Sequence, residues 1–313
     1  MTKAAEKTLV LFKIEATEGT DAAPVEATDA ILTRNFSPTF LDAETKERNL
    51  DQVYFGARPS TLAKLSRRTQ FEVEIAGSGT AGTIAPWQKL LRPCGFDAGT
   101  VTAGTKVTSA LISSGIPSAT LHDYYDNLRL KQTGSRGAVG FTFEDDEIPF
   151  WSFDFLGHPV QPLADENTAS AATLTAFKDP VVASTENTVI TLGAYSAPIR
   201  RVTMNSGSAL EFRSLIGPVD RVLYRNRAWA GEVVMEVPDL TAKDYFANVL
   251  SRTTIAGVIT HGTVAGNIVA ITMPRLELGS PTFSNEQGAL MASFPLKALP
   301  STAGNDEIVI EAR

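Results

Sequence analysis

A strand, a small-residue turn and a short helix follow one another in residues 68–96, and this unit constrains the fold more than any other stretch. In the strand, apolar residues alternate with Glu72 and Glu74, which is the period of a half-buried β-strand. The next residues, GSGTAG, are too rich in glycine to continue as strand or helix. Trp87 and Leu91 then lie on one face of a short helix that ends at the sequence PCG.

A second copy of this unit occurs in the second half of the chain. Residues 231–237, GEVVMEV, form the strand, in which Glu232 and Glu236 again alternate with apolar residues. Residues 242–250 form the helix, and Tyr245 lies on its apolar side. A repeat of a supersecondary unit at this separation indicates two related domains in tandem.

The two expected domains are residues 1–160 and 187–313. The stretch 161–186 between them is rich in Ala, Ser, Thr and Pro and has little hydrophobic periodicity, so it is predicted to be a linker. Strand patterns dominate both halves, and helices are short and few. Because strands and helices do not alternate as in parallel sheets, we expect an all-β protein with short flanking helices. Its architecture should be two tandem antiparallel β-sandwich or barrel-like domains.

Residues 41–67 are charged and are interrupted by Gly56 and Pro59. This stretch is interpreted as a loop, and it is longer than the roughly 4–6 residues of most connections. It is either a surface excursion or an arm that reaches a neighbouring subunit. Apolar side chains are costly to expose together, which favours a partner surface. The candidate contact residues are Leu50, Val53, Tyr54, Phe55 and Arg58.

The overall composition narrows the class of protein. The 313 residues carry a formal net charge of −7, which disfavours a surface that wraps nucleic acid. The single cysteine, Cys94, excludes an internal disulfide, and three histidines in all disfavour a structural zinc site. Apolar runs are much shorter than the ~20 residues that span a bilayer, and the N-terminus lacks the pattern of a signal peptide. We therefore expect a protein made in a reducing cytoplasm.

No group of residues predicts a catalytic, cofactor-binding or metal site. His122, His158 and His261 stand in separate contexts without metal-ligand spacing. Residues 77–82 match G-x-G-x-x-G, but the preceding strand carries glutamates and the flanking pattern is antiparallel, unlike a dinucleotide-binding unit. The acidic residues 144–147 lack the spaced ligands of a calcium-binding loop and are predicted to be a solvated hairpin tip.

Segments spread over nearly the whole chain resemble the tail tube (major tail) proteins of long, non-contractile-tailed bacteriophages. In the first half they are AILT (30–33), ERNL (47–50), EIAGSGTAG (74–82), LLRPCGF (90–96) and TGSRG (133–137). In the second half they are FRSLIG (212–217), KDYFA (243–247), THGTVAGN (260–267) and GNDE (304–307). The joint order of these segments makes the resemblance specific, and none of them is a catalytic signature.

The resemblance implies a structural virion protein and no enzyme, cofactor or metal. Tail-tube-like β-sandwich domains, six to a ring, would surround a channel, and stacked rings would form the tube through which the genome passes. Implied partners are further copies of the chain, the tail terminator and the distal tail or baseplate proteins. The tape measure protein and passing DNA would occupy the lumen without specific binding, and no membrane is involved. The implied location is the virion tail, after synthesis and assembly in the bacterial host cytoplasm.

The repeat then predicts the ring. If each half supplies one of six positions, three chains form a homotrimeric, pseudo-hexameric ring. The alternative is a tube domain with a decorating outer domain, and six chains per ring. In the first arrangement, the alternating carboxylates face the lumen and repel DNA phosphates. These candidate lumen residues are Glu72, Glu74, Glu232 and Glu236. The alternative for them is a solvated outer face, and the loop at 41–67 is expected to contact an adjacent subunit in the next ring.

A competing interpretation is a non-catalytic, all-β module that binds carbohydrate or a cell surface. Such a module would be expected to have a signal peptide and exposed aromatic residues on one face. The sequence lacks the first, and most of its aromatic residues alternate into expected cores. The ring-forming interpretation is therefore favoured.

Overall fold

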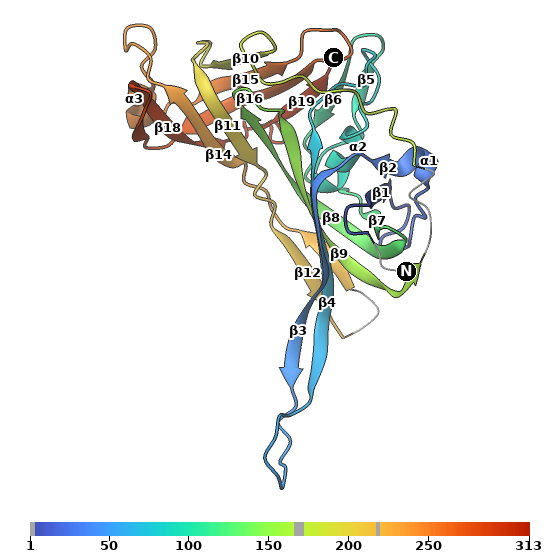
Figure 1. Cartoon of the computed structure of the whole chain (residues 1–313). Coiled ribbons are helices and arrows are strands. Elements are labelled where there is room, and N and C mark those ends of the chain that lie inside the picture. The colour runs from blue at the N-terminus through green and yellow to red at the C-terminus, as the bar shows by residue number, and fades with distance from the viewer. Residues whose placement is uncertain (1–3, 166–171, 217–219) are drawn as a thin grey trace.

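The computed structural model describes residues 4–165, 172–216 and 220–313 and consists mainly of antiparallel strands (Figure 1). Within these ranges the helices are α1 (Glu26–Asp29), α2 (Gln88–Leu91), α3 (Tyr245–Ser251) and the 3-10 turn η1 (Arg92–Cys94). The predicted all-β fold with short flanking helices is confirmed.

One continuous antiparallel sheet passes from the first half of the chain into the second. In spatial order its strands are β3 (Arg34–Glu47), β4 (Ser60–Glu74), β9 (Phe150–Asp165), β8 (Leu128–Glu144), β11 (Ile199–Asn205), β14 (Ala230–Glu236), β18 (Ala289–Ala298) and β17 (Thr282–Glu286). Each half contributes four of these eight strands. The junction between the halves is the pairing of β8 with β11, in which Phe141 lies opposite Met204.

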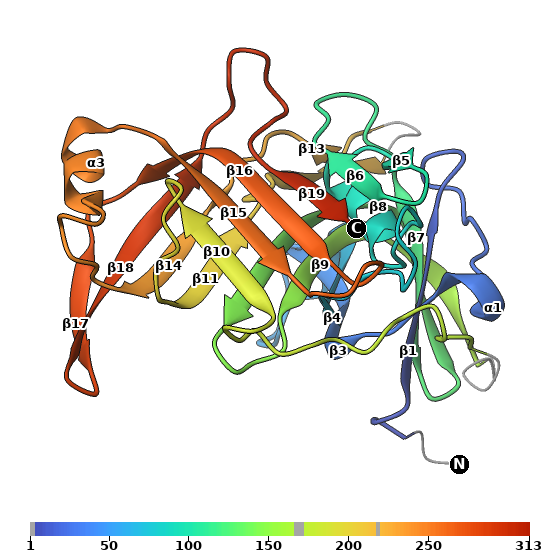
Figure 2. The same ribbon diagram turned by 90° about the horizontal axis from the view of Figure 1, so that it is seen from above.

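A second layer of strands lies on the other side of the core. In the first half it is β2 (Ala30–Ile31), β1 (Thr8–Ile14) and β7 (Ala119–Tyr125), and β7 joins β8. In the second half it is β10 (Thr188–Leu192), β15 (Ile255–His261) and β16 (Val269–Leu278), and Figure 2 shows these strands crossing over β11 and β9. The C-terminal β19 (Val309–Ala312) pairs with β16 and with β6 (Lys106–Ala110), and β6 also pairs with β5 (Thr100–Thr102).

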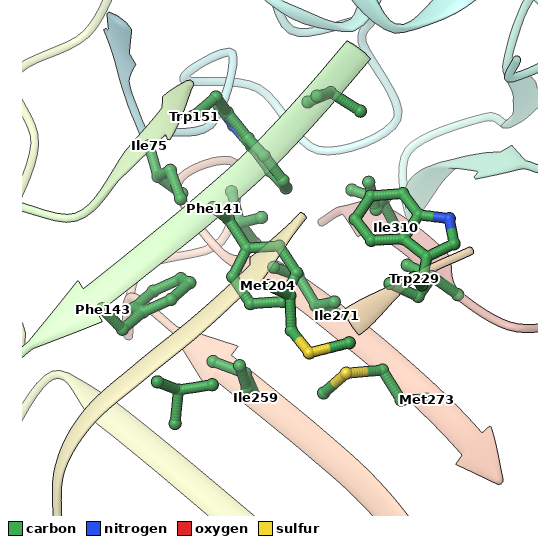
Figure 3. Packing of buried hydrophobic residues seen from close by; sticks show 14 of the residues in the cluster. Ile75, Phe141, Phe143, Trp151, Met204, Trp229, Ile259, Ile271, Met273 and Ile310 are labelled. Carbon is green, nitrogen blue, oxygen red and sulfur yellow. The ribbon is translucent and has the colours of Figure 1, made fainter. Parts of the chain in front are cut away.

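The hydrophobic core between the two layers is one cluster that contains residues of both halves. Figure 3 shows Phe141 and Trp151 of the first half together with Met204, Ile259 and Ile271 of the second. The strands present these side chains because their apolar residues alternate with polar ones, and the buried set faces inward. Burial of this set stabilises both layers together.

The two halves repeat the same strand order. In the first half, neighbouring strands run β3–β4–β9–β8–β7–β1, and in the second β11–β14–β18–β16–β15–β10. The helices also correspond, because α2 follows β4 and α3 follows β14. The division into domains at 1–160 and 187–313 stays a prediction. The sheet and the core cluster each include residues of both halves.

The interpretation of residues 41–67 as a loop was wrong. Most of this stretch belongs to the long strands β3 and β4, which form a hairpin with only residues 48–59 as its loop. The distal parts of both strands are exposed on both faces, so they lack the apolar alternation that identifies a strand in a sequence. We call this hairpin, beyond Phe40 and Ser66, the arm, and Figure 1 shows it projecting away from the body.

The expected second helix begins three residues later than its pattern suggested. Its first residue is Tyr245, because the Asp244 carboxylate accepts a hydrogen bond from the Ala247 amide at 2.9 Å and so caps it. The expected linker at 161–186 also differs, since β9 continues to Asp165. The part of that linker at 166–171 lies outside the described residues.

Candidate functional site

The eight-stranded sheet has a polar face opposite the core. On β4, Phe71 and Val73 are buried, so Glu72 and Glu74 between and beyond them lie on the other face. The same alternation on β14 buries Val233 and Met235. The four predicted carboxylates, Glu72, Glu74, Glu232 and Glu236, are therefore brought to one face of one sheet. That this face lines a lumen stays a prediction.

Two of these carboxylates have basic partners on the same face. The Arg34 side chain donates to Glu72 at 2.8 Å, and the Asn35 amide donates to the same oxygen at 2.7 Å. Arg201 lies 3.5 Å from Glu232, which also accepts a hydrogen bond from Ser293.

The other two carboxylates lie at the end of the sheet away from the arm. Within the described ranges, Glu74 and Glu236 have no ion-pair partner, so they carry the uncompensated negative charge of the set. They line two open grooves at corresponding positions. One groove, of about 750 Å³, contains Glu236 and Arg200, and the other, of about 140 Å³, contains Glu74 and Arg34.

The end of the arm carries the predicted contact residues, and all of them are exposed. Val53 and Phe55 are fully exposed at 101% and 108%, and Tyr54 is 70% exposed. Leu50 is also exposed, and Arg58 reaches the Asn49 side chain at 3.4 Å. That these residues contact a neighbouring subunit stays a prediction.

A second hairpin, in the other half, has an exposed apolar tip that the hydrophobic pattern does not predict. It consists of β12 (Leu210–Ser214) and β13 (Asp220–Tyr224), and between them Leu215 is 57% and Ile216 is 110% exposed. The similarity of EFRSL (211–215) to KERNL (46–50) was the available signal, because both stretches approach the tip of a hairpin. The segment from β11 to β14 is thus a counterpart of nearly the same length as the segment from β3 to β4.

Unlike the arm, the second hairpin packs on the body. The Phe212 ring lies 6.1 Å from the His158 ring of β9, and Val222 is buried. The Val222 carbonyl accepts a hydrogen bond from Arg136 of β8, and the Tyr224 hydroxyl donates to the Cys94 carbonyl at 3.2 Å. The two hairpins therefore correspond in sequence position and differ in what covers them.

His122, His261 and Cys94 are buried in the protein. Burial lowers the pKa of His122 and of His261 to about 4, and burial raises the pKa of the Cys94 thiol. His122 lies 3.0 Å from Asp21, and His261 packs edge-on against Phe143. Among the described residues, no group of three or more potential ligands could hold a metal ion.

The glycine-rich turn at 77–82 is used for packing within the chain. The Gly77 amide donates to the Asn267 side chain at 2.6 Å, and the Gly79 amide donates to the Gly266 carbonyl at 2.8 Å. A Cβ on Gly77 would lie 2.1 Å from the Gly266 carbonyl oxygen, so this close approach requires glycine.

No helix in the described part of the chain is long and apolar enough to cross a membrane.

Comparison with known proteins supports the interpretation of the fold. A family model described as phage tail tube protein matches residues 5–298, which is nearly the whole chain. No curated protein matches the chain. On the extent of this match, the chain belongs to the phage tail tube protein family and is a structural component of a phage tail.

Proposed function

We propose that this protein assembles into stacked rings that form the tail tube, and that the tube is a channel for genome passage into the host. The observation that carries the proposal is the repeated six-strand order, with the two halves joined edge to edge through β8 and β11. A sheet whose two outer strands are unpaired can continue into further copies until it closes.

Three chains per ring follow from the repeat. Each chain holds two copies of the same strand arrangement, so three chains supply six equivalent positions around an axis. The alternative is six chains per ring with the second half as an outer decoration. In that arrangement β14 would not be expected to belong to the same sheet as β4. The pairing of both strands into one sheet supports the trimer.

The polar face of the sheet is the proposed lumen wall. It carries Glu72, Glu74, Glu232 and Glu236, while the core lies on its other side. Unpaired carboxylates at Glu74 and Glu236 would repel DNA phosphates, so the genome would slide without specific binding. The tape measure protein would occupy the same space before DNA passes.

Rings are proposed to stack head to tail through the hairpin tips. The arm tip with Val53, Tyr54 and Phe55 lies at one end of β4, and the groove beside Glu74 lies at the other. A heterologous contact between unlike ends of a molecule produces an open filament, as a tube requires. The same two ends would meet the tail terminator and the distal tail or baseplate proteins.

Cryo-electron microscopy of the purified protein tests the proposal. The expected result is rings or tubes with three chains per ring and the polar sheet face inward. Six chains in one ring would overturn the stoichiometry. A protein that stays monomeric under all assembly conditions would overturn ring formation and favour a binding module instead.

A further inference from the structure

The sheet has two free edges, and we propose that they join between copies in a defined register. Within the described residues, β3 pairs only with β4, and β17 pairs only with β18. We infer that β3 of one copy pairs antiparallel with β17 of a second copy of this chain. The inference rests on the proposed ring and adds the residues that close it.

The pairing of β8 with β11 inside the chain serves as the template for the pairing of β17 with β3 between two copies. Arg201 lies opposite Glu144, and Met204 lies opposite Phe141. Phe141 is only 1% exposed and Met204 only 2%, and both lie in the hydrophobic core (Figure 3). This is how one repeat unit joins the next along the sheet.

The strand registers identify the counterpart of each strand in the other half. Phe141 and Phe283 correspond, because Phe141 pairs with Trp151 and Phe283 pairs with Ala292 at the matching position of β18. The neighbouring strands give the same correspondence of Trp151 with Ala292. Val73 of β4 lies opposite Trp151, and Met235 of β14, its counterpart, lies opposite Ala292. β17 and the last five residues of β8 are thus equivalent edges.

The β3 edge is matched to β11 in the same way. With β4 and β14 aligned, Arg34 opposite Glu72 corresponds to Arg201 opposite Val234, and Thr39 opposite Arg68 corresponds to Asn205 opposite Ala230. When each residue of the β8–β11 pairing is replaced by its counterpart on β17 or β3, the register between two copies follows. The opposed pairs are Arg34 with Glu286, Ser37 with Ser284, Pro38 with Phe283 and Thr39 with Thr282.

Burial and charge agree with this register. Phe283 is 56% exposed although its counterpart Phe141 is buried, so the free chain lacks the strand that would cover it. It already contacts Phe246 at 5.9 Å, and Pro38 of the second copy would lie on its open side. Arg34 opposite Glu286 repeats the charges of Arg201 opposite Glu144.

Pro38 lies on the β3 edge that would meet β17 of the second copy. Proline has no N–H to donate to a ladder and is tolerated in a strand where its nitrogen faces the free side. In the proposed register its nitrogen faces β17, so this junction has one backbone hydrogen bond fewer than the pairing of β8 with β11.

Disulfide cross-linking tests the register. In the template, Ser206 donates to Val139 at 2.8 Å, so Asn205 and Gly140 form a non-hydrogen-bonded pair, in which side chains approach most closely. Their counterparts are Thr39 and Thr282. A chain with both T39C and T282C, assembled and then oxidised with copper phenanthroline, should give disulfide-linked dimers and trimers on a non-reducing gel. The native Cys94 is buried and should not interfere.

The matched control moves one cysteine by two residues. T39C with S284C places the sulfur about 6.6 Å further along the strand, beyond the reach of a disulfide. Efficient linking of this control, or assembled tubes of T39C/T282C that remain unlinked, would overturn the register and leave the ring intact. Wild-type protein that forms no ring would overturn the proposed function and this inference with it.

A substitution at the edge gives a second measurement if the cysteine variant does not assemble. Phe283→Asp should leave a folded monomer, since the side chain is more than half exposed, and should abolish rings by placing a charge in the junction. Val101→Asp, at a residue 50% exposed on β5, is the control and should still form rings. Rings from Phe283→Asp would contradict the inference.

Discussion

The Arg67 guanidinium donates a hydrogen bond to the Asp123 carboxylate at 2.6 Å, and neither side chain is accessible to solvent beyond 2%. Asp123 also accepts from the Thr69 hydroxyl at 2.7 Å. Arg67 lies on β4 where the arm leaves the body, and Asp123 lies on β7 in the other layer. The pair therefore fixes the root of the arm to the second layer of the first half.

Removal of the charge at Asp123 should destabilise the protein strongly. In Asp123→Asn the Arg67 charge stays buried without its counter-ion, which costs about 3–5 kcal/mol in comparable buried pairs. The free energy of unfolding from urea titration of the unassembled protein measures this loss. Asp154→Asn, which breaks a partly exposed pair with Arg68 at 3.2 Å, should change it by at most about 1 kcal/mol. Equal losses from the two variants would show that the buried pair contributes no more to the free energy of unfolding than the partly exposed one.

The arm tip should matter for tube length and not for folding. Replacing Val53, Tyr54 and Phe55 together by serine removes exposed apolar side chains, so the stability of the unassembled chain should stay within about 0.5 kcal/mol. The variant should form rings that do not elongate, because the apolar contact to the next ring is lost. Negative-stain microscopy measures tube length, and tubes of normal length would refute the stacking role.

Reversal of the lumen charges should make the tube retain DNA. Glu74→Lys with Glu236→Lys replaces the two unpaired carboxylates of the polar face by cations, which attract phosphates in a salt-dependent way. Assembled tubes of this variant should bind short DNA at low salt, and wild-type tubes should not. Glu26→Lys on α1 is the control for added charge alone. Equal DNA binding by variant and control would place Glu74 and Glu236 outside the channel.

The buried histidines make stability depend on pH. Burial lowers the pKa of His122 and His261 from 6.5 to about 4, so between these values the unfolded chain binds more protons than the folded one. Their contribution is complete above pH 6.5 and is lost as the pH falls towards 4. The urea midpoint should therefore fall between pH 7 and pH 5, and His261→Asn should flatten this dependence. A midpoint that falls by the same amount in His261→Asn as in the wild type would contradict this role of the buried imidazole.

The sequence was sufficient to predict the elements that have one apolar and one polar face. Phe71 and Val73 alternate with glutamates because β4 has one buried face there, and such a strand is readable without its partners. The repeated unit of strand, turn and helix was readable for the same reason, since α2 and α3 each bury an apolar side. The apolar tip at Val53 to Phe55 was also visible, although not the hairpin that carries it.

Other features depend on residues that are far apart in the chain. The strands of the arm were not predicted because the distal parts of β3 and β4 are exposed on both faces and are held by backbone hydrogen bonds, which leave no pattern of side chains. Asp123 and Arg67 are separated by 56 residues, and nothing local to either predicts their contact.

The sequence by itself determined the all-β class, the internal repeat, the exposed tip and the alternation that brings carboxylates to one face. Only the tertiary structure decided that β8 meets β11, that both halves share one core, and that β3 and β17 are left as edges. The physical reason is that side-chain periodicity is a local property of a strand, whereas the choice of its neighbour depends on backbone hydrogen bonds and packing with segments elsewhere in the chain.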